Sequence, residues 1–232
     1  MTDPELHHFA VEGRSIAYRM RSGSSPTLVF LPGYASDMEG AKAVSLDAFA
    51  ETRGLAMLRL DYSGTGSSDG RFEDGTLDRW LQETLAAIDQ LTSGPLIIVG
   101  SSMGGWLALH VALARPDRVL ALVGIAAAPD FTDWGFADGA AAEAAGIARG
   151  FWESGQRMRL LHSAIEIDRP VRLVHGEDDR DVPVEVAMRT LAALRSADVQ
   201  LKIIKGGGHR LSEPHEIDAI LRTVAELLEP SP

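Results

Sequence analysis

Short apolar runs alternate along the chain with longer amphipathic stretches. The runs have the length and content of buried strands, and we expect strands over residues 27–31, 55–60, 96–99, 119–125, 171–174 and 199–204. Between them, apolar residues recur at helical spacing over residues 38–53, 77–92, 102–114, 184–196 and 213–228. Strands that are separated by helices form βαβ units. The pattern therefore predicts an α/β fold, a mainly parallel sheet with helices on both faces.

Two segments depart from this alternation. Residues 9–18, with Glu12 and Gly13 between two arms, predict an antiparallel hairpin at the edge of the sheet. Residues 129–168 hold more aromatic residues than an even spread would give, namely Phe131, Trp134, Phe136, Phe151 and Trp152. This segment is either a helical insert that packs its aromatics on the main domain or a lid over an apolar pocket, and the two are compatible.

We therefore expect one domain over residues 1–232, with a short helical cap inserted at about 129–168. The candidate pocket or lid residues of this cap are Trp134, Phe136, Phe151 and Trp152.

Composition excludes several classes of protein. The chain has no cysteine, so disulfides, thiolate nucleophiles and cysteine-ligated metals are ruled out. Its 22 Lys and Arg against 33 Asp and Glu give a net charge of −11, which argues against nucleic-acid binding. The acidic start of the chain lacks the pattern of a secretory or transit leader, and a cytoplasmic protein is expected, with a mature mitochondrial form as the lesser alternative. Residues 90–114 are uncharged, but their glycine-rich centre predicts strand, turn and helix rather than a membrane span.

The strongest motif is a strand that runs into Gly100-Ser-Ser-Met-Gly104 and then into a helix. A serine at such a tight turn needs small residues two positions before and after it, and its hydroxyl then projects at the positive end of a helix. Ser102 meets this condition with Gly100 and Gly104, whereas Ser101 would have Val99 and Met103. We identify Ser102 as the candidate nucleophile.

A serine hydroxyl needs a base, and the base needs an acid that orients it. Among seven histidines, His209 follows the last expected strand in a loop with three preceding glycines, where an imidazole can reach the carboxyl ends of the strands. The acid is expected after the strand at 171–174, in a loop that carries Glu177, Asp178, Asp179 and Asp181. Asp130 follows the preceding strand and stays open as an alternative.

The order and local patterns of these residues resemble the α/β-hydrolase family over nearly the whole chain. The family's loop H-G-x-x-D-x-x-V-P matches residues 175–183, and this match places the acid at Asp179. Leu31-Pro-Gly-Tyr34 resembles the family's oxyanion loop, which implies that the backbone N–H groups of Tyr34 and Met103 hold the oxyanion.

The resemblance implies a serine hydrolase that cleaves carboxylic esters or thioesters through an acyl-enzyme, without a cofactor. Its partner would be a small-molecule ester or thioester, or an S-acylated protein. Acyl-protein thioesterase and acyl-glucuronide esterase are the specific activities expected, and general small-ester carboxylesterase or lipase-like activity and C–C bond hydrolysis are alternatives. A ligand receptor that has the same fold without catalysis is a remote alternative. The histidines show no metal-binding spacing, and no metal site is expected.

Overall fold

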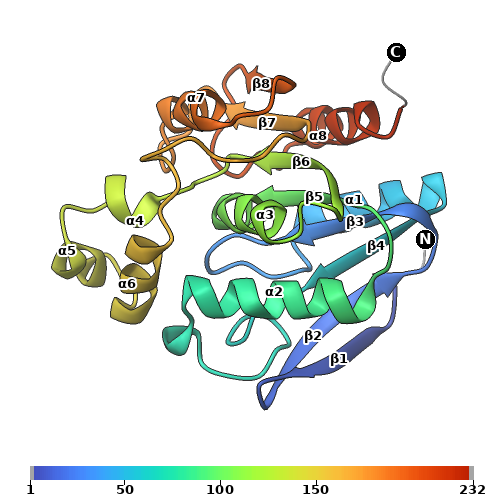
Figure 1. Cartoon of the computed structure of the whole chain (residues 1–232), viewed down its shortest axis with the longest axis horizontal. Helices are drawn as coiled ribbons and strands as arrows, with labels where there is room; N and C mark the ends of the chain where they lie inside the picture. The colour runs from blue at the N-terminus through green and yellow to red at the C-terminus, as the bar shows by residue number, and fades with distance from the viewer. Residues whose placement is uncertain (1–2, 230–232) are drawn as a thin grey trace.

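The computed structural model describes residues 3–229 and contains one eight-stranded sheet (Figure 1). Its strands run in the spatial order β1-β2-β4-β3-β5-β6-β7-β8. Their bounds are β1 Leu6–Val11, β2 Arg14–Arg21, β3 Ser24–Leu31, β4 Leu55–Leu60, β5 Leu96–Ser101, β6 Val119–Ile125, β7 Val171–Gly176 and β8 Val199–Ile204. The six expected runs are strands, and the predicted α/β-hydrolase fold is confirmed.

The sheet is parallel except at one edge. β1 pairs antiparallel with β2, and β2 pairs antiparallel with β4, whereas the remaining neighbours are parallel. The hairpin between β1 and β2 turns at Glu12 and Gly13, both at positive φ (47° and 79°). Two successive residues at positive φ make the type of tight turn whose twist matches that of the strands. The expected edge hairpin is present and is longer at both ends than the pattern indicated.

Helices cover both faces of the sheet (Figure 1). One face carries α2 (Leu77–Leu91), α3 (Met103–Ala114) and α7 (Val184–Ala193), and the other carries α1 (Ala41–Arg53) and α8 (Pro214–Glu226). Neighbouring side chains of a strand point to opposite faces, so a strand covered on both sides must be apolar throughout. In β3, Val29 and Leu31 pack under α2 and α3, while Leu28 and Phe30 pack under α1 and α8.

Two of the expected helices lose three residues at one end. α1 begins at Ala41 rather than at residue 38, because Met38 is buried and its backbone N–H donates to Oδ1 of Asp61 at 2.7 Å. α7 ends at Ala193 rather than at residue 196, because Leu194 leaves the helix and forms a parallel bridge with Ile165. In both cases a contact with a distant residue takes the chain out of the helix.

Three short helices lie between β6 and β7, and Figure 1 shows them together beside one end of the sheet. They are α4 (Phe131–Trp134), α5 (Gly139–Ala144) and α6 (Arg149–Arg157). The uncharged stretch at residues 90–114 divides into the end of α2, β5 and α3. Over residues 3–229, every helix falls short of the length and apolar character that crossing a membrane requires.

Candidate active site

Ser102 occupies the sharp turn between β5 and α3. Its backbone has φ 54° and ψ −120°, a conformation that side chains adopt rarely and that raises the energy of the backbone. A Cβ atom at Gly100 would collide with the carbonyl group of Gly104, and one at Gly104 would collide with the carbonyl group of Leu31. The turn therefore requires glycine at both positions, which is the condition that singled out Ser102.

His209 lies between the candidate nucleophile and the candidate acid. Its Nε2 atom is 3.1 Å from Oγ of Ser102, and its Nδ1 atom is 2.9 Å from Oδ2 of Asp179. Ser102 follows β5, Asp179 follows β7 and His209 follows β8, so the carboxyl ends of parallel strands bring the three together from positions up to 107 residues apart. This is a hydrogen-bonded series of hydroxyl, imidazole and carboxylate, in the order that nucleophilic catalysis by serine uses.

The carboxylate of Asp179 is fixed on both of its oxygens. Oδ1 accepts the backbone N–H groups of Asp181 at 3.0 Å and Val182 at 2.9 Å, while Oδ2 faces His209. Burial by itself would raise the pKa of Asp179, but the hydrogen bonds from His209 and from the N–H of Val182 outweigh it, and the pKa lies below the ordinary value. Asp179 is therefore an ionised acceptor that can hold one orientation of the imidazole.

His175, the fifth residue of β7, supports the loop that carries this acid. Its Nε2 atom lies 2.8 Å from the carbonyl oxygen of Val182 and 3.5 Å from Oδ2 of Asp179. The side chain is 1% exposed, so the loop rests on a buried imidazole. His175 is the first residue of the family loop matched at residues 175–183, but the sequence reasoning expected no role for it.

The other carboxylates that competed for this role form no hydrogen bond with His209, although Asp181 borders the same pocket. Glu177 pairs with Lys205 at 2.5 Å, and Asp178 and Asp181 are exposed. Asp130 is buried, but its oxygens accept backbone N–H groups of residues 160 and 161. Among the five candidates, the structure brings only Asp179 to hydrogen-bond distance of His209.

Two backbone N–H groups stand free beside the nucleophile. Within residues 3–229, the N–H groups of Tyr34 and Met103 donate no hydrogen bond to a protein acceptor, whereas those of Ser102 and Gly105 do. Met103 is the first residue of α3, where the helix dipole favours negative charge. These are the two groups that the family resemblance implies for an oxyanion hole, and they remain available to a ligand.

A pocket of about 330 Å³ has Ser102 and His209 in its wall. The rest of the wall is mostly apolar and is formed by Tyr34, Ala128, Phe131, Trp134, Phe136 and Val182. Arg180 and Asp181 add a polar side that the sequence reasoning did not anticipate. Their position in the loop of Asp179 was the available signal, since a loop that delivers the acid also borders the site.

Of the four aromatic residues expected at the pocket or lid, two line the pocket and two do not. Trp134 and Phe136 line it, and Nε1 of Trp134 donates to the carbonyl oxygen of residue 129 at 2.7 Å. Phe151 lies in α6 and is fully buried, with its ring centroid 4.8 Å from that of Tyr34, so it stays a candidate for the lid. Trp152 also lies in α6, outside this wall, and packs under the guanidinium of Arg149 at 5.6 Å.

Three potential metal ligands also meet here. One ligand atom each of Asp179, Asp181 and His209 lies within 4.8 Å of the others. Both oxygens of Asp179 already accept protein hydrogen bonds, and Nδ1 of His209 faces one of them. A metal ion would have to replace this hydrogen bonding, so the donor set fits the series from serine to acid better than it fits a cation.

Known proteins share the sequence pattern and the fold of this chain. The alpha/beta hydrolase fold family covers residues 26–146. The human mitochondrial palmitoyl-protein thioesterase ABHD10 is 37% identical in an alignment 235 residues long, which covers 93% of this chain and 77% of that protein. The structure of mouse alpha/beta hydrolase domain-containing protein 10 superimposes with a TM-score of 0.90 at 34% identity, covering 97% of this chain and 98% of the other. A putative hydrolase from Agrobacterium vitis S4 gives a TM-score of 0.90 at 35% identity, with 97% and 99% coverage.

These relatives contradict the expected location and confirm the expected family. The ABHD10 proteins of human, mouse and cattle are mitochondrial, so the expectation of a cytoplasmic location is contradicted. A targeting leader is separate from the folded domain, and the acidic first residues of this chain were no basis for a location. The extent of the family match, the identity to ABHD10 and the shared fold agree with one another. The chain belongs to the α/β-hydrolase family and is a hydrolase similar to ABHD10.

Proposed function

We propose that this protein is a serine hydrolase that cleaves carboxylic esters or thioesters through an acyl-enzyme. The observation that carries the proposal is the hydrogen-bonded series from Oγ of Ser102 through His209 to Asp179, at 3.1 and 2.9 Å. These distances are those at which a positioned base can take a proton. Family membership supports hydrolysis, and the hydrogen-bonded series supports the roles of nucleophile, base and acid that we propose.

In the first half of the reaction, Oγ of Ser102 attacks the acyl carbon and passes its proton to Nε2 of His209. A negative charge develops on the former carbonyl oxygen, and the free N–H groups of Tyr34 and Met103 are placed to donate to it. The imidazolium then gives its proton to the leaving oxygen or sulfur as the bond to the acyl carbon breaks. Asp179, held by two backbone N–H groups, stabilises the imidazolium without taking a proton itself.

In the second half, a water molecule takes the place of the leaving group. His209 removes its proton as the water oxygen attacks the acyl carbon, and the same N–H groups hold the second oxyanion. The proton returns to Oγ of Ser102 as the ester bond breaks, and the carboxylic acid leaves. The residues finish in their starting protonation states, so the cycle needs no added oxidant, metal or cofactor.

The substrate class follows from the pocket and the relatives. The apolar wall formed by Phe131, Trp134 and Phe136 suits an acyl chain. ABHD10 is named a palmitoyl-protein thioesterase, and acyl-protein thioesterase activity is accordingly the specific activity we propose, with acyl-glucuronide esterase activity beside it. An S-acylated protein is then a candidate partner. We further propose that the single domain carries residues 129–168 as a cap over this pocket.

Arg180 and Asp181 favour a second candidate, a carboxylesterase for small esters. Their charges make one side of the pocket polar, and a long chain gains nothing from such a wall. A profile of kcat/KM over p-nitrophenyl esters and acyl-cysteine thioesters of two to sixteen carbons separates the two candidates. A rise toward long thioesters supports the thioesterase, and a maximum at short esters supports the carboxylesterase.

The nucleophile is tested by labelling with a fluorophosphonate, which reacts with activated serines. Ser102→Ala is expected to abolish labelling and to lower kcat at least about 10³-fold, because loss of a residue that acts in such a unit removes most of the rate. Ser93→Ala, an exposed serine outside the site, is the matched control. Mapping of the label to Ser101 instead of Ser102 would overturn the assignment, and absence of labelling in the wild-type protein would favour a ligand receptor.

A further inference from the structure

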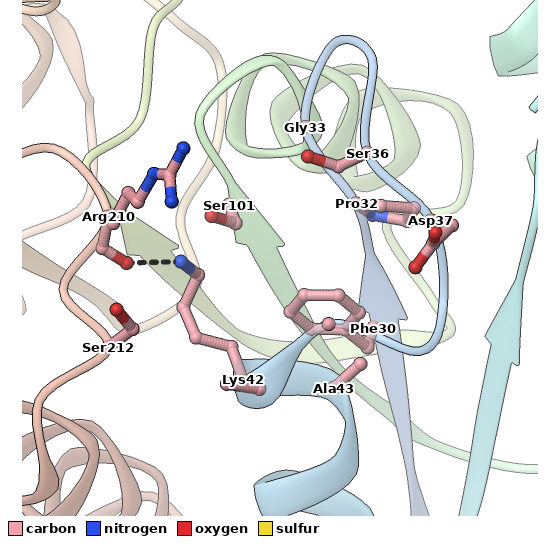
Figure 2. Close-up of a pocket in the computed structure, with 12 residues that line it drawn as sticks. Phe30, Pro32, Gly33, Ser36, Asp37, Lys42, Ala43, Ser101, Arg210 and Ser212 are labelled. Carbon is pink, nitrogen blue, oxygen red and sulfur yellow. Dashed lines mark hydrogen bonds between the residues drawn. The ribbon is translucent and has the colours of Figure 1, made fainter.

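A second pocket, of about 360 Å³, is drawn in Figure 2. The two pockets divide three pairs of consecutive residues between them. The second pocket takes Gly33, Ser101 and Arg210, and the first takes their chain neighbours Tyr34, Ser102 and His209. The second pocket thus shares its dividing wall with the nucleophile, the base and the oxyanion loop. Its lining includes Asp37, Lys42, Arg210 and three serines beside Phe30 and Pro32, whereas four aromatic side chains line the first pocket.

Two cations border the second pocket without a carboxylate partner. Within the part of the chain that the structure describes, neither Lys42 nor Arg210 forms an ion pair. Nζ of Lys42 donates to the backbone carbonyl oxygen of Arg210, and Figure 2 shows both side chains on the same side of the pocket. Burial and the charge of Arg210 lower the pKa of Lys42, while Glu216 opposes this shift. A bound anion would relieve the repulsion between the two cations.

The remaining acid of the pocket lies away from the cations. Asp37 is on the opposite side from Lys42 and Arg210 in Figure 2. Its Oδ1 atom accepts the backbone N–H of Glu39 at 2.9 Å. Asp37 therefore leaves the side that carries the cations open to a negative charge.

The first turn of α1 forms another part of the lining, through residues 40–43. This helix has 13 residues, its N-cap Gly40 offers no side-chain acceptor, and its first turn contains no acid. The first N–H groups of a helix have no partner within it, and the helix dipole makes them favour an anion. The positive end of α1 therefore faces the same space as Lys42.

Ser101 supplies an independent indication that a ligand binds here. The residue is 7% exposed, its side chain lines the pocket, and Figure 2 shows its hydroxyl directed into the space near Arg210. Across residues 3–229, this hydroxyl has no hydrogen-bond partner in the protein. The hydroxyl opens into the pocket, so a ligand or water that enters the pocket is the group that can satisfy it.

We propose that the second pocket binds a carboxylate or phosphate group on the leaving group of the substrate. This inference rests on the proposed function and deepens it, because it names the chemistry of the departing half. His209 must give a proton to the leaving atom, and Arg210 and Ser212, which follow His209 in the chain, line the second pocket, so we place the leaving group toward this pocket. The acyl chain then takes the apolar pocket, and the anionic group takes the cationic one.

The test compares three esters that share one short acyl chain. The leaving groups are phenol, 3-hydroxybenzoate and methyl 3-hydroxybenzoate, of which only the second carries a charge. The methyl ester matches it in shape. We expect kcat/KM of the wild-type protein to be at least about tenfold higher for the 3-hydroxybenzoate ester than for its methyl ester. A phenyl ester that bears a 3-phosphate is expected to share this preference.

Variants assign the preference to the pocket. Lys42→Met removes a cation and Ser101→Ala removes the unpartnered hydroxyl, and each is expected to cut the preference to threefold or less, mainly through KM. Arg222→Gln is the matched control, because Arg222 is an exposed cation that pairs with Asp218 on α8 and lies outside the pocket. This control is expected to keep the full preference. Because Lys42→Met and Ser101→Ala change different groups, the test still holds if one of the two variants fails to fold.

Inorganic phosphate separates a leaving-group site from a site for free anions. Competitive inhibition by phosphate together with the preference for the charged ester supports the proposal. Inhibition by phosphate without that preference overturns it in favour of a free-anion site. Equal rates for the three esters, without inhibition, also overturn it. If these rates still require Ser102, the proposed function stands and only the inference about the second pocket fails.

Discussion

Both carboxylate oxygens of Asp130 accept the backbone N–H of Leu160, at 2.8 and 3.0 Å. Oδ2 also accepts the N–H of Leu161 at 2.7 Å, and Asp130 is 2% exposed. Asp130 is the N-cap of α4, and Leu160 follows α6, so these hydrogen bonds join the two ends of the segment that holds α4, α5 and α6. Asp130 thus has a structural role, because its oxygens hold the backbone of residues 160 and 161 and form no hydrogen bond with His209.

This relationship leads to opposite expectations for two aspartates. Asp179→Asn is expected to lower kcat by up to about 10⁴-fold, because an amide can hold His209 in the wrong tautomer. Asp130→Asn is expected to destabilise the protein by about 1–3 kcal/mol, because an amide replaces a carboxylate that accepts from buried N–H groups. Measurements of kcat on one ester and of urea unfolding on both variants check the pair.

The same experiment includes the exposed neighbours of the acid. Glu177→Gln, Asp178→Asn and Asp181→Asn are each expected to change kcat by less than about tenfold, because solvent screens their charges. A large loss at Asp130 or Asp178, with Asp179→Asn close to normal, would contradict the assignment of the acid.

The turn at Ser102 gives a second prediction, on stability. Gly104→Ala places a Cβ atom against the carbonyl group of Leu31, where the backbone of β3 cannot move without breaking the sheet. Overpacking of this kind costs about 1–3 kcal/mol or more, and the nucleophile would be displaced with it. Gly150→Ala is the matched control, because its new Cβ would have only an ordinary contact of 3.5 Å with Thr76. Equal stability of the two variants by urea unfolding would show that the turn is not tight.

Residue pattern alone predicted the strands and the nucleophile for a definite physical reason. A parallel strand covered on both faces is a continuous apolar run, and a strand–serine–helix turn requires glycine at fixed offsets. The acid was harder, because spacing cannot tell which of several neighbouring carboxylates points inward. The match of residues 175–183 to the family loop supplied Asp179, which Asp181 and Val182 hold in place through their N–H groups.

Other features depend on contacts that no local pattern contains. Phe151 is buried because α6 packs against Tyr34 and Trp80, which come from distant parts of the chain. The second pocket is assembled from the loop after β3, the end of β5 and the loop after β8. Lys42 and Ser101 are ordinary residues in sequence, and only their meeting in space gives them a shared chemistry.

The hydrogen bonds to Asp179 also predict how stability depends on pH. The pKa of this carboxyl is below its ordinary value of 3.8, so near that pH the unfolded chain binds more protons than the folded one. Its contribution is therefore present above the ordinary value and is lost as the pH falls through the lower pKa of the folded state. The unfolding free energy of wild type is expected to fall more steeply than that of Asp179→Asn from about pH 5 to pH 3. Parallel curves from urea unfolding over this range would contradict the shift.

Selectivity for the acyl chain gives the last prediction. Trp134 lines the pocket beside Ser102, whereas Trp152 lies outside that wall under Arg149. A methylene that is buried against a matching wall contributes about 0.8 kcal/mol, so removal of the wall should reduce the gain in kcat/KM with each added carbon. Trp134→Ala is therefore expected to flatten the profile of kcat/KM against chain length, and Trp152→Ala is expected to leave its slope unchanged. Flattening by Trp152→Ala alone would place the acyl chain on the α6 side of the cap. Unchanged slopes in both variants would show that these aromatic residues only stabilise the cap.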